Sequence, residues 1–188
     1  MWKIILFCTF LSVSQANIRN IYGDWTMVAF YPVASHQPTC IRFSFTKSPV
    51  SIKCSYADGR RAIPVQVSMT SEKGEILERY SMPMRVVETP EEVMPGLEMG
   101  CKCGNEEVND HAVVRIINEN YFIMFHYITK ESSRTETEPN AAYVFAKNVE
   151  PQRKLAKFTS NVDDLKGRKG AMMCYTENFN GFGDENEI

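Results

Sequence analysis

The sequence lacks a long hydrophobic run, a strong excess of one charge and any Asn-x-Ser/Thr motif. Without a run of about 20 apolar residues, the chain is not expected to insert into a membrane. Its 21 basic and 23 acidic residues give a net charge of −2, so no strong field would attract nucleic acid. We therefore expect a protein that binds neither nucleic acid nor the bilayer interior and carries no N-linked glycan.

The common catalytic and metal-binding motifs are also missing. The chain has no glycine-rich phosphate loop, no Gly-x-Ser-x-Gly and no His-Glu-x-x-His sequence. Its three histidines are scattered, and Cys101, Cys103 and His111 have the spacing of no standard zinc site. We therefore expect no metal, no other cofactor and no enzymatic activity.

What is present is the composition of an ordinary globular protein, with 44% hydrophobic and 23% charged residues in a chain of 188. No internal repeat is visible, so we expect one domain. Residues 1–16 (MWKIILFCTFLSVSQA) combine Lys3, a short apolar stretch and the end Ser14-Gln15-Ala16. This pattern predicts a secretory signal peptide and an extracellular protein. Removal of these residues leaves five cysteines, an odd number.

The remaining sequence mostly alternates between apolar and polar residues, which predicts β-strands. A run of prolines and cysteines at 83–110 is expected to be irregular. About eight short strands are predicted, at 23–31, 39–46, 50–56, 62–70, 75–82, 112–117, 121–129 and 141–147. This pattern is typical of an all-β barrel or sandwich.

The period changes after the last predicted strand. Pro151 suits the first turn of a helix, and apolar residues then recur at helical spacing: Leu155, Phe158, Val162 and Leu165. We predict one amphipathic helix at about 150–166, packed on the outside of the sheet.

Two motifs carry a resemblance to a known family. Gly23-Asp24-Trp25 stands at the start of the first strand, and AYVFAK at 142–147 ends the last strand before the helix. In this respect the chain resembles a divergent lipocalin, with Lys147 where the family more often has arginine. Over 17–175, the resemblance implies an eight-stranded antiparallel up-and-down barrel (calyx) with one C-terminal α-helix outside. The acidic residues near the C-terminus separately predict a flexible acidic tail at 176–188.

The resemblance also implies roles for individual residues. Gly23, Trp25 and Lys147 would form the closed end, where the Lys147 cation packs on the indole. The barrel would bind and transport a small hydrophobic ligand, such as a lipid, retinoid, fatty acid or bile pigment. The apolar faces predict these lining residues: Met27, Phe43, Phe45, Ile52, Tyr56, Val65, Val67, Met69, Leu77, Val114, Ile116, Ile123, Phe125, Tyr143 and Phe145. Alternatively, these side chains only fill a core.

The cysteines leave two further hypotheses open. The resemblance implies a Cys40–Cys174 disulfide outside the barrel, and Cys54 would pair with Cys101 or Cys103. If Cys54 were instead a free thiol facing the cavity, the barrel could act as a thiol-dependent isomerase. As a third hypothesis, the loops at the barrel mouth would bind an unknown receptor or other protein.

Overall fold

The computed structural model describes residues 18–32, 40–56, 59–87, 96–100, 102–103, 110–128 and 139–176. The predicted signal peptide at 1–16, Cys101 and the tail at 177–188 lie outside this part of the chain. The described strands are β1 (Gly23–Tyr31), β2 (Ile41–Lys47), β3 (Cys54–Ser55), β4 (Ile63–Ser71), β5 (Ile76–Val87), β6 (Gly96–Met99), β7 (Lys102–Cys103), β8 (Asp110–Asn118), β9 (Tyr121–Ile128), β10 (Ala141–Ala146) and β11 (Ala171–Met172).

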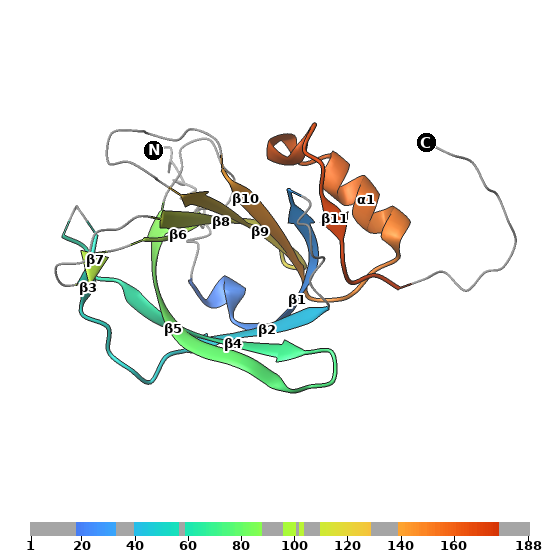
Figure 1. The fold of residues 1–188 in the computed structure, drawn as a ribbon. Helices are drawn as coiled ribbons and strands as arrows, with labels where there is room; N and C mark the ends of the chain where they lie inside the picture. Colours follow the sequence, from blue (N-terminus) through green and yellow to red (C-terminus); the bar gives the residue numbers. More distant parts are fainter. Residues whose placement is uncertain are drawn as a thin grey trace, which may run out of the picture.

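The strands form a closed antiparallel barrel of eight strands, which confirms the predicted fold class. Around the barrel the order is β1, β2, β4, β5, β6, β8, β9 and β10, and β10 then pairs with β1, for example through Phe145 and Met27. Figure 1 looks along this ring of strands. A further short strand, β11, pairs with the second half of β1 beyond the segment that pairs with β2.

The alternation in the sequence explains which side chains point into the barrel. In β4, Val65 and Val67 are fully buried, whereas the alternate residues Gln66 and Ser68 are partly exposed. Successive side chains of a strand point to opposite faces, so the apolar set fills the interior and the polar set meets solvent. This is the pattern from which the strand was predicted.

One of the eight predicted strands was wrong. The segment at 50–56 contributes only β3, which pairs with β7 in a separate two-stranded sheet. Its apolar side chains pack in a small cluster of their own, with Cys54 and Tyr56 buried against Ala62. The eighth barrel strand is β6, which lies in the region predicted to be irregular and has only four residues. A strand so short leaves almost no alternation to detect.

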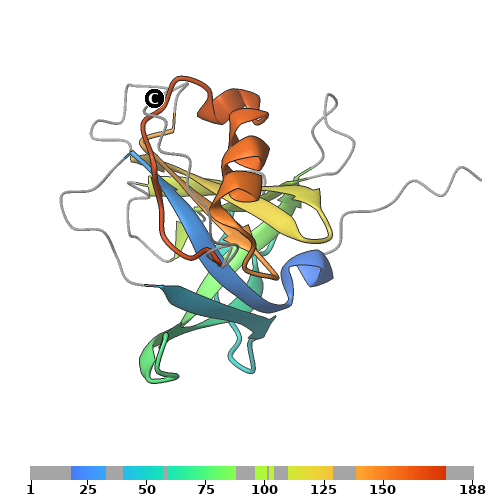
Figure 2. The same cartoon turned by 90° about the vertical axis from the view of Figure 1, so that its right-hand side faces the viewer.

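The closed end contains the residues that the family resemblance indicates. The 3-10 helix η1 (Ile18–Ile21) lies at one end of the barrel (Figures 1 and 2). The Trp25 Nε1–H donates a hydrogen bond to the Ile21 carbonyl at 2.7 Å. Lys147 Nζ lies 5.1 Å from the Trp25 ring centroid, within the range of a cation–π interaction. Gly23 joins η1 to β1 with φ of 113°, a conformation that disfavours other residues.

The C-terminal helix is shorter than the predicted span of 150–166. Helix α1 covers Gln152–Ser160 and is followed by the 3-10 helix η2 (Asp163–Leu165). The helix ends because Val162 takes an extended conformation, with φ −88° and ψ 113°. The apolar stripe nevertheless continues, since Leu155 and Leu165 are both buried in the same cluster as residues of β1, β9 and β10. Figure 2 shows α1 on the outer surface of the barrel.

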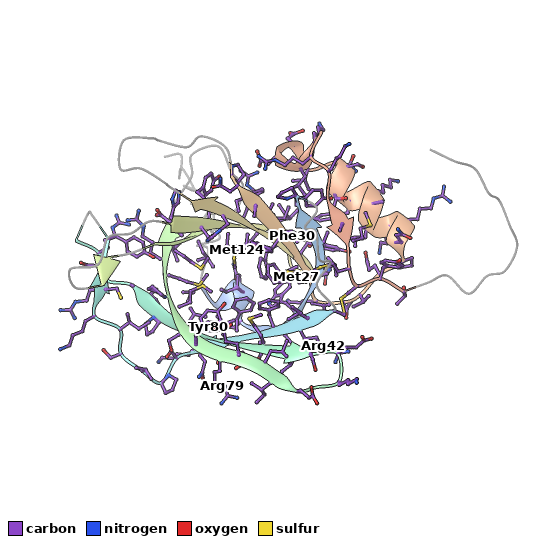
Figure 3. The ribbon with its side chains drawn as sticks, viewed as in Figure 1. Met27, Phe30, Arg42, Arg79, Tyr80 and Met124 are labelled. Atoms are coloured by element: carbon purple, nitrogen blue, oxygen red, sulfur yellow. A yellow bond between two sulfur atoms is a disulfide. The ribbon has the colours of Figure 1, made fainter. Side chains whose placement is uncertain are left out.

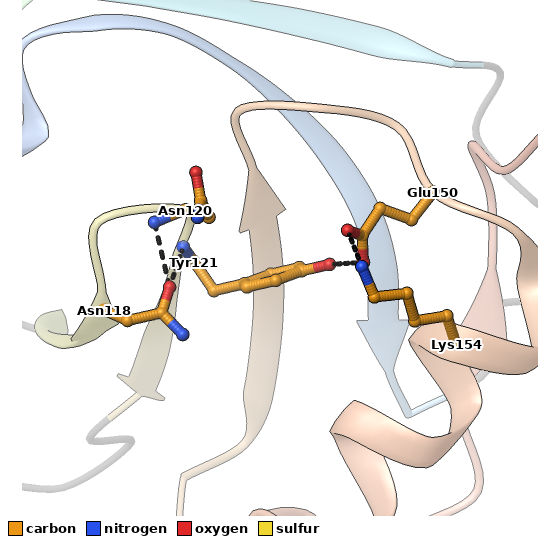
Figure 4. Close-up of polar contacts among 5 residues, drawn as sticks. All are labelled: Asn118, Asn120, Tyr121, Glu150 and Lys154. Carbon is orange, nitrogen blue, oxygen red and sulfur yellow. Dashed lines mark hydrogen bonds and ion pairs between the residues drawn. The ribbon is translucent and has the colours of Figure 1, made fainter.

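Tyr121 of β9 contacts both α1 and the residue Glu150 that precedes this helix, and Figure 4 shows the polar contacts. The Tyr121 hydroxyl donates a hydrogen bond to the Glu150 carboxylate, which also forms an ion pair with Lys154. The Tyr121 ring stacks on Phe158 with a centroid distance of 4.2 Å. Desolvation and the Glu150 carboxylate raise the pKa of Tyr121. Desolvation alone would raise the pKa of Glu150, but the hydrogen bonds from Lys154 and Tyr121 lower it below 4.5.

The C-terminal segment is held to the barrel by a covalent link as well. Cys40 and Cys174 form a disulfide, as predicted, with their Cα atoms 5.4 Å apart. The link joins residues 134 positions apart in the sequence, so it strongly restricts the unfolded chain. None of the helices in the described part of the chain has both the length and the apolar character of a membrane span.

Candidate functional site

A cavity of about 330 Å³ lies inside the barrel. Its lining comes from seven of the barrel strands, all except β8. The lining residues are Met27, Ile41, Phe43, Phe45, Met69, Tyr80, Met82, Met99, Met124, His126, Tyr143 and Phe145. Figure 3 shows Met27, Tyr80 and Met124 inside the ring of strands, whereas Arg42 and Arg79 point outward.

One side of the cavity is formed by aromatic rings. Phe43 and Phe45 come from β2, and Tyr143 and Phe145 come from β10, and both strands flank β1. We call these four residues the aromatic wall. The Phe145 ring meets Phe43 edge-on at 5.0 Å and stacks on Phe122 at 4.5 Å. Contacts of this kind fix the ring positions, so the aromatic wall is held in place by its neighbours.

The other side of the cavity is formed by thioethers. Met69, Met82 and Met99 come from three consecutive strands, β4, β5 and β6, and Met124 comes from β9. We call these four residues the methionine wall. In the order around the barrel, β5 lies opposite β10 and β6 opposite β1, so Met82 and Met99 face the aromatic wall across the cavity. Met69 and Met124 lie beside the aromatic wall, as the cross-strand neighbours of Phe43 and Tyr143. Unbranched thioether side chains have several low-energy conformations and adapt to the shape of what they contact.

Three lining residues have a polar group. Tyr80 and His126 lie on the side of the methionine wall, and Tyr143 lies in the aromatic wall. Burial and the nearby Glu78 carboxylate raise the pKa of Tyr80, and burial raises the pKa of Tyr143. Both phenols are therefore protonated at neutral pH and can donate a hydrogen bond into the cavity. Tyr80 is 37% exposed, which places it at the solvent side of the cavity.

The structure brings six of the predicted lining residues together at the cavity. These are Met27, Phe43, Phe45, Met69, Tyr143 and Phe145. Four other predicted residues point into the barrel but belong to the packed core around Trp25, and they are Val65, Val67, Val114 and Ile116. For these four, the alternative interpretation as core residues holds.

The remaining five predicted lining residues were assigned to the wrong place. Ile123 and Phe125 lie on the outer face of β9, in the cluster that includes Leu155 of α1. Because the helix covers that face, β9 is apolar on both sides and its alternation does not indicate which side is inner. Leu77 is 52% exposed, since β5 places its even-numbered residues, such as Tyr80, in the cavity.

Ile52 and Tyr56 lie in the separate cluster beside β3, outside the cavity lining. The Tyr56 hydroxyl donates a hydrogen bond to the Glu98 carbonyl, and its ring lies 4.2 Å below the Arg85 guanidinium carbon. The Arg85 side chain also pairs with the Glu98 carboxylate. These contacts hold the segment at 50–56 against β5 and β6, which is a structural role.

Sequence reasoning missed half of the cavity lining. The residues missed are Ile41, Tyr80, Met82, Met99, Met124 and His126. Ile41 lies on the same face of its strand as Phe43 and Phe45, so the alternation in the sequence could have predicted it as a lining residue. Met124 and His126 follow once the even-numbered face of β9 is known to be the inner one. Met99 carried no such signal because of the short strand in which it lies.

Cys54 is disulfide-bonded and lies outside the cavity lining. The backbone register places it opposite Cys103. It therefore lacks the free, cavity-facing thiol that the isomerase hypothesis requires. The described residues contain no group of three or more His, Cys, Asp or Glu side chains that could hold a metal ion.

Comparison with known proteins does not assign this chain to a family. A scan against models of known protein families and a search of curated proteins found no match to this chain.

Proposed function

We propose that this protein is a lipocalin-type extracellular carrier that binds a small hydrophobic molecule in the barrel cavity. The observation that carries the proposal is the cavity itself, whose volume of about 330 Å³ is not filled by side chains. Ligand sites in proteins typically have about 300–1,000 Å³ and a mostly apolar lining with few polar groups. The lining here has nine apolar side chains beside Tyr80, His126 and Tyr143.

Two further observations support the proposal. The closed barrel and the Trp25–Lys147 contact match what the resemblance to lipocalins implies. The Cys40–Cys174 disulfide, together with the bonded state of Cys54, suits a protein that works in an oxidising extracellular fluid. Binding would be driven by removal of apolar ligand surface from water, while the tyrosine hydroxyls would orient the polar end of the ligand.

The proposal is tested with N-phenyl-1-naphthylamine, an uncharged probe whose fluorescence rises in apolar surroundings. We expect saturable binding to the protein with its disulfides intact. Met69→Arg places a cation at the cavity lining, and this cation loses hydration when the probe binds. Because the apolar probe offers the cation no polar partner, the affinity for the probe should fall at least about tenfold. Arg side chains can extend their charge towards solvent, and Met69 is only partly buried, so we expect the variant to fold.

Ser68→Arg is the matched control, since Ser68 is adjacent in β4 and points to the outer face. Its affinity for the probe should equal that of the wild type. Absence of saturable binding to the wild type, or equal binding by both variants, would contradict a carrier that uses this cavity.

A further inference from the structure

The chemistry of the cavity lining restricts the molecules that it can hold. None of the lining residues in the described chain is Asp, Glu, Lys or Arg. The two arginines nearest to the lining in sequence, Arg42 and Arg79, point away from the cavity (Figure 3). Glu78 is close enough to Tyr80 to raise its pKa, so the nearby charge that acts on the lining is negative. A buried anionic ligand would therefore lose hydration without gaining a Lys or Arg partner among the described lining residues.

The two walls also differ in what they offer to an uncharged ligand. Aromatic rings of the ligand can stack or meet edge-on with Phe43 and Tyr143 of the aromatic wall. Beside and opposite these rings, sulfur atoms of the methionine wall make favourable contacts with aromatic rings of a ligand, and a saturated molecule of the same shape would not gain them. A conjugated ligand is thus favoured from both sides of the cavity.

The polar groups are few and lie close to the solvent side. The Tyr80 and Tyr143 hydroxyls can each donate a hydrogen bond, and His126 lies on the same strand as Met124 of the methionine wall. These three side chains can pair with a few polar groups of a ligand and leave the rest of its surface to apolar contact.

We propose that the cavity selects uncharged aromatic or conjugated molecules with few hydrogen-bonding groups, and that the methionine wall distinguishes them from saturated molecules of similar size. This inference rests on the proposed function, because it specifies the ligand of the same cavity.

Three compounds that share a fused bicyclic ring system of ten carbons test the inference by calorimetric titration at neutral pH. They are 1-naphthol, which is aromatic and uncharged, decahydro-1-naphthol, which is saturated and uncharged, and 1-naphthoate, which is aromatic and anionic. We expect 1-naphthol to bind about twofold to tenfold more tightly than the saturated alcohol. Its advantage over the anion should be at least about tenfold.

The role of the methionine wall is tested in the double variant Met99→Leu with Met124→Leu. These substitutions keep side-chain volume and apolarity but remove two sulfur atoms, and swaps of this kind are well tolerated. We expect the preference for 1-naphthol over decahydro-1-naphthol to fall to about half or less. Met84→Leu is the matched control, because Met84 is buried in the barrel core but does not line the cavity. If the double variant does not fold, as judged by circular dichroism, the partly exposed Met69→Leu replaces it.

The outcomes separate the inference from the proposed function. If the saturated alcohol or the anion binds as tightly as 1-naphthol, the inference is overturned while the carrier function stands. An unchanged preference in the double variant overturns the role of the methionine wall. If none of the three compounds binds, the inference fails, and the titration with N-phenyl-1-naphthylamine then shows whether the carrier function fails with it.

Discussion

The closed end of the barrel and the methionine wall of its cavity are built from different apolar side chains. At the closed end, large rings are almost completely buried: Trp25 and Phe145 are 2% exposed and Phe122 is fully buried. The Trp25 ring meets Phe122 edge-on with a centroid distance of 4.7 Å. In the cavity, the methionine wall includes side chains that are only partly buried, such as Met69 and Met124, and they surround an unfilled volume.

This difference separates what stabilises the fold from what would bind a ligand. The rings at the closed end fit one another at fixed angles, and the hydrogen bond from Trp25 to Ile21 gives the buried indole N–H a partner. Phe45 and Phe145 belong both to this ring cluster and to the cavity lining. The cavity therefore has a rigid floor and, on the side of the methionine wall, an adaptable surface. Substitutions in the two regions should affect different measurements.

The largest expected effect is at the closed end. Trp25→Ala removes a buried indole together with its contacts to Phe122 and Lys147. We expect the free energy of unfolding to fall by about 3–5 kcal/mol, as for other large aromatic-to-alanine changes in cores. Urea unfolding followed by circular dichroism measures it. A loss below about 1 kcal/mol would mean that the closed end does not carry the stability assigned to it.

The second effect concerns the covalent link outside the barrel. Replacing Cys40 and Cys174 together by serine should lower the free energy of unfolding by about 2–4 kcal/mol, because the unfolded chain regains conformational freedom. Affinity for N-phenyl-1-naphthylamine should be retained at temperatures where the variant is folded, since neither cysteine lines the cavity. Loss of binding in the folded variant would show that the link also shapes the cavity.

A smaller, pH-dependent effect is expected from Glu150. Its pKa is lowered in the folded state relative to its ordinary value of 4.5, so the ionised form favours folding above that pH and the contribution disappears as the pH falls through the folded pKa. At pH 7, the free energy of unfolding of Glu150→Gln should be about 1 kcal/mol lower than that of the wild type. Under strongly acidic conditions, the two free energies of unfolding should be almost equal. Unfolding curves between these limits measure the difference, and Tyr121→Phe should reproduce part of it. A difference that does not vary with pH would contradict an ionised Glu150 as the cause.

The smallest effect on stability is expected in the methionine wall. Met99→Leu keeps the volume and should change the free energy of unfolding by less than about 1.5 kcal/mol. Its effect should instead be seen in the affinity for 1-naphthol. A large loss of stability without a change in affinity would place Met99 with the closed-end core rather than with the binding surface.

The part of this arrangement that could be predicted from the sequence is the part with local signals. Trp25 and Lys147 stand in short motifs at the two ends of the barrel sequence, and Phe43 and Phe45 lie in a strand with one polar face. Ile123 could not be assigned correctly, because its strand is buried on both faces, one by the helix. Met99 could not be identified at all, since four residues carry too little periodicity. The walls of the cavity depend on which strands lie opposite each other, and this is a property of the closed barrel rather than of any local segment.

The separation of stability from binding is tested most directly by thermal unfolding with and without saturating N-phenyl-1-naphthylamine. A ligand that binds only the folded state raises the midpoint of unfolding. We predict that Trp25→Phe starts below the wild type but is raised by the probe as the wild type is. Met69→Arg should start near the wild type and show a clearly smaller rise. The opposite pattern, with the probe raising Met69→Arg but not Trp25→Phe, would contradict the account.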